Sequence, residues 1–183
     1  MSHHDGGDFL PLSLAIATVS DSRVADTDTS GQLLRERALA AGHHVLEHVI
    51  CRDDLYQLRA LLSRWIADAA IQVILTTGGT GLTGRDRTPE AVLPLLDKPI
   101  DGFGELFRAL SRAEIGTATV QSRACAGLAN GTLIFCLPGS TGACRTAWDG
   151  ILAAQLDRRT RPCNFVQLLH RFVEDRGPEA HDR

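Results

Sequence analysis

The chain has 183 residues, of which 44% are hydrophobic and 22% are charged, and its formal net charge at pH 7 is −3. This composition is typical of a globular protein, and the length suits one domain better than two. A weakly acidic chain has no global attraction to nucleic acid or to an anionic membrane, so neither is expected as a partner.

The two ends of the chain are polar, and the apolar part lies between them. Residues 1–11 carry no signal-peptide pattern and are expected to be a disordered lead, residues 12–173 one α/β domain, and residues 174–183 a flexible tail. The longest apolar runs are too short to cross a bilayer. Five cysteines without a CxxC pair favour reduced thiols and a cytoplasmic location. Cys51, Cys125 and Cys136 are expected as small buried hydrophobic residues.

The first half of the chain alternates strand-like and helix-like segments. Residues 12–20 form a partly β-branched apolar run, which predicts a buried strand, and a helical pattern from residue 29 stops at Gly42. A strand is then expected over 44–51, a helix behind Asp53 and Asp54, and a short strand over 71–76. Three strands alternating with two helices predict right-handed crossovers and an open, mostly parallel sheet.

The second half of the chain adds helices and a hairpin. Short helices are expected from Pro89 and over 103–110. Residues 122–128 and 132–137 are strand-like, and Asn130-Gly131 between them predicts a tight antiparallel hairpin, which makes the sheet mixed. A helix to about residue 156 and a last helix from Pro162 complete the pattern. The expected fold is a three-layer α/β/α domain.

A glycine-rich loop follows the third predicted strand and consists of Thr77, Gly78, Gly79, Thr80 and Gly81. In open α/β sheets, ligands bind outside the carboxyl ends of the strands, which is where this loop is expected. Glycines let the backbone amides approach a ligand closely, and the threonine hydroxyls add donors, so phosphate is the ligand that suits the loop.

The sequence matches neither of two common nucleotide-binding motifs. Residues 79–84 (GTGLTG) have the glycine spacing of a Walker P-loop, but Arg85 and Asp86 follow in place of Lys and Ser/Thr. No GxGxxG sequence follows the first predicted strand, which argues against a nicotinamide dinucleotide fold. A standard NTPase and a Rossmann dehydrogenase are both disfavoured.

A second loop, made of Pro138, Gly139 and Ser140, lies between a predicted strand and a predicted helix. Ser140 or Thr141 can cap that helix, whose first amides then face an anion, although an ordinary strand-to-helix turn is an equal alternative. If both loops lie at the same sheet edge, they can hold two anionic groups or the two ends of one long ligand.

Asp53 and Asp86 each allow two interpretations. Either can cap the helix that follows it, and either can hold Mg²⁺, which takes one or two carboxylates together with substrate phosphates. Arg85 and Arg123 flank the loops and can neutralise phosphate. The sequence contains no evident Ser-His-Asp arrangement.

Seven short segments occur in an order that is specific as a set. They are DTSG at 28–31, TGGTG at 77–81, DRTPEA at 86–91, GFGELFR at 102–108, EIG at 114–116, SR at 122–123 and LPGS at 137–140. Together they resemble the molybdopterin-binding family that includes the bacterial MoaB and MogA proteins and the G-domain of gephyrin. The resemblance covers roughly residues 12–165, and residues 139–148 and 159–165 are most similar to the MoaB branch.

This resemblance implies a homotrimer or a dimer of trimers that acts on molybdopterin, with other molybdenum cofactor biosynthesis proteins as further partners. Catalytic members of the family adenylylate molybdopterin with Mg-ATP and release pyrophosphate. The resemblance therefore implies molybdopterin as ligand, ATP as co-substrate and Mg²⁺ as cofactor. The alternative is a non-catalytic molybdopterin-binding or carrier paralogue, and a scaffold role like that of gephyrin is a weaker third.

The family's functional positions transfer to this chain by their place in the motifs. Asp53 and Asp86 match the acidic positions tied to catalysis and Mg²⁺, although the residues alone leave open whether Asp53 or Asp54 faces the site. Residues 77–81 and 138–140 match ligand-contacting loops. The remaining expected ligand-binding residues are Asp28, Ser30, Arg85, Ser122 and Arg123.

Overall fold

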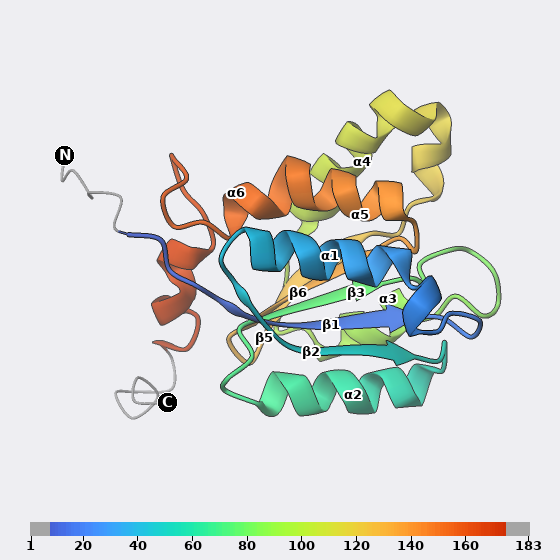
Figure 1. The fold of residues 1–183 in the computed structure, drawn as a ribbon, viewed down its shortest axis with the longest axis horizontal. Helices are drawn as coiled ribbons and strands as arrows, with labels where there is room; N and C mark the ends of the chain where they lie inside the picture. The colour runs from blue at the N-terminus through green and yellow to red at the C-terminus, as the bar shows by residue number, and fades with distance from the viewer. Residues whose placement is uncertain (1–7, 175–183) are drawn as a thin grey trace.

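The computed structural model describes residues 8–174 and contains one six-stranded sheet with the order β2-β1-β3-β6-β5-β4 (Figure 1). In chain order the strands are β1 Ser13–Val19, β2 His44–Cys51, β3 Val73–Thr77, β4 Lys98–Pro99, β5 Cys125–Ala129 and β6 Thr132–Leu137. The expectations for residues 1–7 and 175–183 lie outside the described residues. No helix in the described part of the chain has both the length and the hydropathy that spanning a bilayer requires.

The sheet is mixed, as the sequence predicts. β2, β1, β3 and β6 run parallel, whereas β5 and β4 are antiparallel to their neighbours. β3 is buried along its whole length, which explains its continuous apolar sequence. Asn130 and Gly131 join β5 to β6 with φ angles of 52° and 84°, and two positive φ angles define the type I′ turn that the Asn-Gly pair favours.

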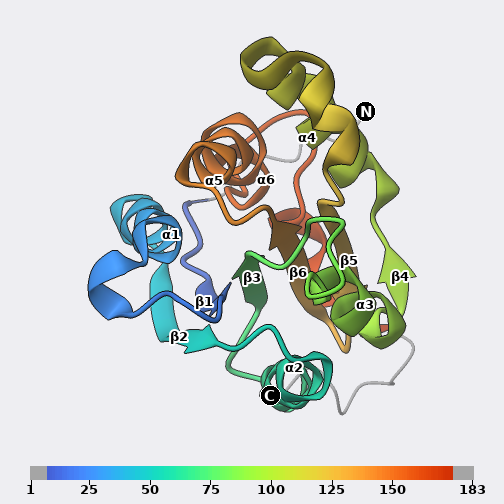
Figure 2. The same cartoon turned by 90° about the vertical axis from the view of Figure 1, so that its right-hand side faces the viewer.

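Helices cover both faces of the sheet, which confirms the three-layer architecture (Figure 2). One face carries α1 Thr29–Ala40, α4 Asp101–Ile115, α5 Thr141–Ala147 and α6 Ala153–Gln155, and the other carries α2 Leu55–Ala67 and α3 Thr88–Val92. Two separate hydrophobic clusters result. Phe135 packs toward the α4 side, while its neighbours in β6, Ile134 and Cys136, pack toward α2 and α3. This alternation is the two-residue period of a strand buried on both faces.

Two segments differ from the sequence prediction near the carboxyl end. The helix expected to reach residue 156 changes to π-helical geometry over Trp148–Leu152 between α5 and α6. The helix expected from Pro162 is wrong, because only a 3-10 helix forms, over Val166–Arg171. Asn164 explains this difference: its side chain accepts from the amide of Gln167 at 3.0 Å, and the amide of Phe165 bonds instead to the distant carbonyl of Gln155 at 3.1 Å.

The sheet edge also differs from expectation. β5 begins at Cys125 rather than at residue 122, and β4 was not predicted, because its two residues are too short to show a period. Two backbone hydrogen bonds flank β4, from Asp97 to Leu128 and from Ile100 to Ala126, each of 2.8 Å. These contacts place the start of α4 beside the edge of the sheet.

His43 links the start of β1 to the end of α1 and makes folding depend on pH. The ring is buried, and its Nδ1 accepts a hydrogen bond from the backbone amide of Leu12 at 3.1 Å. Burial lowers the pKa of His43 from 6.5, an effect that the charge of Asp157 partly opposes. The unfolded chain therefore takes up a proton at a higher pH than the folded chain.

We therefore expect the free energy of unfolding to decrease as pH falls below 6.5, with a slope of up to about 1.4 kcal/mol per pH unit from this one group. His43→Asn keeps an acceptor for the Leu12 amide but cannot be protonated, so the slope should become shallower. Urea unfolding at a series of pH values between 5 and 7 measures this slope of the free energy of unfolding against pH. His44→Asn, at an exposed neighbour, is the control and should keep the wild-type slope; an unchanged slope in His43→Asn would contradict the assignment.

Candidate functional site

The two predicted ligand loops meet at the carboxyl edge of the sheet. β3 and β6 are adjacent and parallel, with Thr77 paired to Leu137 where both strands end. The amide of Gly78 donates to the carbonyl of Leu137 at 3.0 Å. A Cβ atom added to Gly139 would lie 3.0 Å from the Cα of Gly78, so the two loops are in direct contact. The sequence expectation of a shared edge is confirmed.

Glycine is required at two positions of the first loop. Gly78 and Gly79 have φ angles of 103° and 63°, a conformation that L side chains rarely adopt. A Cβ atom at Gly78 would lie 2.2 Å from the carbonyl oxygen of Val19, and one at Gly79 would lie 2.3 Å from Oγ1 of Thr88. Thr88 also donates to the carbonyl of Gly78 at 2.8 Å, which fixes the loop against the start of α3.

The second loop leads into a capped helix. Ser140 is the N-cap of α5, and its hydroxyl accepts from the amide of Ala143 at 3.3 Å, as expected. The hydroxyls of Thr29 and Thr141 are 2.9 Å apart, so the start of α1 adjoins the start of α5. Ser30 is buried beside this junction and does not line the cavity described below.

Asp28 acts inside the fold rather than at the cavity surface. Its side chain is buried and accepts from Oγ1 of Thr18 at 2.7 Å and from the amide of Gly31 at 2.9 Å. Nε2 of His48 lies 2.9 Å from the same carboxylate. These bonds cap α1 and hold its first turn against β1 and β2. Asp28 does not line the cavity, so its contribution is to position the start of α1.

Asp53 and Asp54 have different roles. Asp54 is the N-cap of α2 and accepts from two backbone amides of its first turn, so the interpretation of Asp53 as that cap is wrong. Asp53 instead accepts from the amide of Arg87 at 3.3 Å. Burial raises the pKa of Asp53, and the nearby charges of Asp86 and Asp21 raise it further, against the opposing effect of the Arg87 amide.

Asp86 lines the cavity and is held in its ionised form. Its carboxylate accepts from the hydroxyl of Thr83 at 2.6 Å and from the amide of Thr83 at 2.9 Å, and the hydroxyl bond is the main reason for its lowered pKa. The N-cap position of α3 belongs to Arg87 and has no side-chain cap, so the capping interpretation of Asp86 is wrong.

Both carboxylates flank the same loop. A Cβ atom added to Gly79 would lie 2.9 Å from Oδ2 of Asp53, and one added to Gly81 would lie 2.6 Å from Oδ2 of Asp86. Among residues 8–174 no group of three or more His, Cys, Asp or Glu side chains is arranged to hold a metal ion. The protein itself therefore offers two carboxylates, and further ligands of a metal would have to come from the substrate or from water.

The side chain of Arg123 binds the backbone of the glycine-rich loop and of Asp86. Its guanidinium donates to the carbonyls of Thr80 at 3.2 Å, Gly81 at 2.6 Å and Asp86 at 3.0 Å, and it also pairs with Glu90. Five donors on a planar group suit this multiple attachment. Arg123 does not line the cavity, which makes it a positioning residue for the glycine loop.

Ser122 and Arg85 are the other two predicted ligand-binding residues, and only one of them lines the cavity. Ser122, next to Arg123, lines the cavity. Arg85 does not line it; its exposed side chain pairs with Asp21. The structure therefore brings residues 78–81 and 138–140, Asp86 and Ser122 to one cavity, with Asp53 beside them. It leaves outside the lining Asp28, Ser30, Arg85, Arg123 and also Thr77, which is buried and donates to the carbonyl of Pro138 at 3.0 Å.

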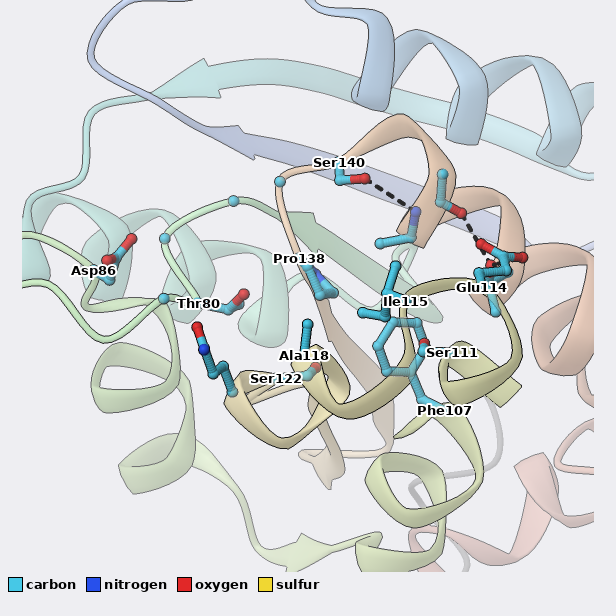
Figure 3. Close-up of a pocket in the computed structure, with 18 of the residues that line it drawn as sticks. Thr80, Asp86, Phe107, Ser111, Glu114, Ile115, Ala118, Ser122, Pro138 and Ser140 are labelled. Atoms are coloured by element: carbon cyan, nitrogen blue, oxygen red, sulfur yellow. Dashed lines mark hydrogen bonds between the residues drawn. The ribbon is translucent and has the colours of Figure 1, made fainter. Parts of the chain in front are cut away.

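The cavity has a volume of about 610 Å³ and a second wall that the sequence analysis did not identify (Figure 3). This wall comes from α4 and the 3-10 helix Gly116–Gln121 that follows it, and consists of Phe107, Ser111, Glu114, Ile115 and Ala118. Glu114 accepts from the hydroxyl of Thr146 on α5 at 3.0 Å, which ties the wall to the opposite helix. One side of the cavity is thus mainly loop backbone, and the other combines the apolar side chains of Phe107, Ile115 and Ala118 with the polar ones of Ser111 and Glu114.

Comparisons with known proteins match almost the whole domain. A family model described as "Probable molybdopterin binding domain" matches residues 15–158. Molybdenum cofactor biosynthesis protein B of Escherichia coli strain K12 is 59% identical over 158 residues, which cover 86% of this chain and 93% of that protein. The protein of the same name from Halalkalibacterium halodurans is 48% identical over 142 residues, which cover 77% and 84%.

Solved structures have the same fold. A crystal structure of a molybdenum cofactor biosynthesis protein B superposes with a TM-score of 0.78 at 42% identity, covering 80% of this chain and 92% of that one. The tungsten cofactor synthesizing protein MoaB from Pyrococcus furiosus superposes with a TM-score of 0.70 at 37% identity, covering 78% and 91%. The chain belongs to the molybdopterin-binding domain family, in its molybdenum cofactor biosynthesis protein B branch.

Proposed function

We propose that this protein binds molybdopterin in the cavity at the carboxyl edge of the sheet and adenylylates it with Mg-ATP, giving adenylylated molybdopterin and pyrophosphate. The observation that carries the proposal is the direct contact of two glycine-containing loops beside a pair of carboxylates. Family membership supports molybdopterin as the ligand.

The charge of the cavity supports a role for a divalent cation. In the described part of the chain no Lys or Arg is among the residues that line the cavity, while Asp86 is, and hydrogen bonds keep it ionised. Backbone amides and the start of α5 attract phosphate, but an anionic carboxylate repels it. A cation between carboxylate and phosphate removes this repulsion.

Mg²⁺ fits the two carboxylates of this site. Mg²⁺ is commonly bound by one or two carboxylates plus substrate phosphates, and Asp53 and Asp86 provide two on either side of one loop. When bound, the ion would supply positive charge to the phosphate oxygens during transfer. Proton loss from Asp53 is needed for that role, and its raised pKa makes binding of the ion weaken at a higher pH than for an ordinary aspartate.

The chemistry requires positioning more than a protein nucleophile. A terminal phosphate oxygen of molybdopterin attacks the α-phosphorus of ATP, a new P–O bond forms, and the bond to the pyrophosphate oxygen breaks. In this scheme the amides of residues 78–81 and the start of α5 hold the phosphates, and Arg123 holds the loop in place. The apolar wall around Phe107 and Ile115 accepts a flat ring and excludes water from it.

Asp86→Asn tests the proposed metal role. Asparagine keeps an oxygen that accepts from Thr83 but removes the charge, so the loop should stay intact while the ion is lost. We expect pyrophosphate release from molybdopterin and Mg-ATP to fall at least about 100-fold, which corresponds to about 2.7 kcal/mol of transition-state stabilisation. Molybdopterin affinity should change by less than about threefold, because amides rather than Asp86 hold its phosphate.

Asp54→Asn is the matched control, because it removes an acidic charge one residue from Asp53 while asparagine still caps α2. It should leave turnover unchanged. A wild-type rate in Asp86→Asn would contradict the metal role. Tight molybdopterin binding by the wild-type protein without any pyrophosphate release would instead support a non-catalytic carrier.

Substitutions in the glycine loop test the proposed phosphate contact. Gly79→Ala places a methyl group against Thr88 and Asp53 at a positive φ angle, so the loop must move. We expect molybdopterin affinity to fall at least about tenfold, since a left-handed L-residue alone costs roughly 1–2 kcal/mol. Gly84→Ala is the control, because its added methyl group meets no atom within 4 Å. Titration calorimetry measures both, and equal affinity for the two variants would contradict the placement.

A further inference from the structure

Two cysteines face each other across the β5–β6 hairpin. Cys125 and Cys136 are direct partners in the antiparallel register, the last pair before β6 leads into the second ligand loop. Directly opposite residues have Cα atoms about 4.5–5.5 Å apart, within the range that a disulfide spans. Both side chains pack into the same cluster beneath α2 and α3, so they point to the same face of the sheet. Both are free thiols in this structure.

The two sulfur atoms differ in access. Cys136 is fully buried, whereas Cys125 is half-buried and lines a second cavity of about 420 Å³ that Arg108 and Arg123 also line. Cys125 is therefore the more accessible of the two residues to a small polar oxidant, and Cys136 is the protected one. A partly accessible thiol next to a second cysteine is the arrangement of an attacking and a resolving cysteine.

The surroundings favour ionisation of Cys125. The neighbouring Cys136 thiol is the largest cause of the lowered pKa of Cys125, and the positive charges of Arg123 and Arg108 lower this pKa further, against the opposing effects of burial and of Glu90. The proximity of Cys125, together with burial, raises the pKa of Cys136. The thiolate is the reactive form of cysteine, so Cys125 reacts first.

We propose that Cys125 and Cys136 form a reversible intramolecular disulfide when the protein meets hydrogen peroxide. The Cys125 thiolate attacks one peroxide oxygen and the O–O bond breaks, which gives a sulfenic acid and hydroxide. The Cys136 sulfur then attacks the Cys125 sulfur and displaces the sulfenic hydroxyl group, which leaves as water with the Cys136 proton. Two thiols are oxidised to one disulfide, and one peroxide is reduced to water and hydroxide, which takes up the proton that Cys125 lost on ionising.

A disulfide between Cys125 and Cys136 would affect both ligand loops, because each of the two strands is connected to one of them. Arg123, two residues before Cys125, holds the carbonyls of Thr80 and Gly81, and Cys136 lies two residues before Pro138. A disulfide draws the two sulfurs to about 2.05 Å, closer than hydrogen-bonded thiols. Closing the bond changes how both side chains pack at the strand ends that support the two loops, so we expect the oxidation state of the pair to affect the loops that line the cavity.

The test is oxidation of the full chain carrying Cys163→Ser, which removes the exposed thiol that could cross-link molecules. After peroxide treatment and denaturation, the free thiols should fall from four to two, and dithiothreitol should restore them. Peptide mapping should join the peptides of Cys125 and Cys136. Cys125→Ala and Cys136→Ala should each abolish the joined peptide, whereas Cys51→Ala, at another half-buried thiol, should retain it.

Hydrogen exchange of residues 79–87 measures the coupling without any ligand, so it is independent of the proposed adenylyl transfer. Exchange in this segment should differ between oxidised and reduced protein and should not respond to peroxide in either alanine variant. The disulfide is refuted if Cys125 is over-oxidised or left unmodified while Cys136 stays a free thiol. The coupling is refuted if the disulfide forms and exchange in residues 79–87 does not change.

Discussion

The structure depends on the close contact between two strand-end loops, because β3 and β6 lie side by side and end together. Gly78 donates to Leu137, and Gly139 approaches the backbone of Gly78 so closely that a side chain on Gly139 would push the loops apart. A side chain on Gly78 would instead meet the carbonyl oxygen of Val19. Adjacent parallel strands make this contact possible, because the loops that follow their carboxyl ends lie at the same edge of the sheet. The ligand cavity therefore forms because the sheet topology brings the two loops together and because glycines allow their backbones to approach closely.

The charged side chains near this contact have two different roles: some hold the protein's own backbone, and others lie beside the ligand loop. Arg123 and Asp28 use their charges inside the protein, one to hold loop carbonyls and the other to cap a helix, so neither is available to a ligand. Asp53 and Asp86 remain beside the open loop. An anionic ligand then meets amides and carboxylates but no basic side chain among the described lining residues. This imbalance is the physical reason to involve a divalent cation, and it connects the fold to the proposed reaction.

Local patterns in the sequence were sufficient for most of the fold but not for the whole cavity. Continuous apolar runs and the Asn130-Gly131 pair predicted the buried strands and the hairpin, because these signals are local. The helix expected from Pro162 was wrong because the Asn164 side chain accepts from the amide of Gln167, three residues on, which is the bond of a residue before a helix rather than inside one. The far wall of the cavity could not be predicted: Phe107, Ser111 and Ile115 share one helix face by their spacing of four, but a face that packs into the core would show the same spacing.

The central claim is that both loops contact one phosphorylated pterin, and a crystal structure of the protein with molybdopterin tests it most directly. The account predicts density for the terminal phosphate between residues 78–81 and the start of α5, with the pterin ring against the wall formed by α4. A ligand bound elsewhere on the sheet, or a cavity that stays empty at saturating molybdopterin, would contradict the account.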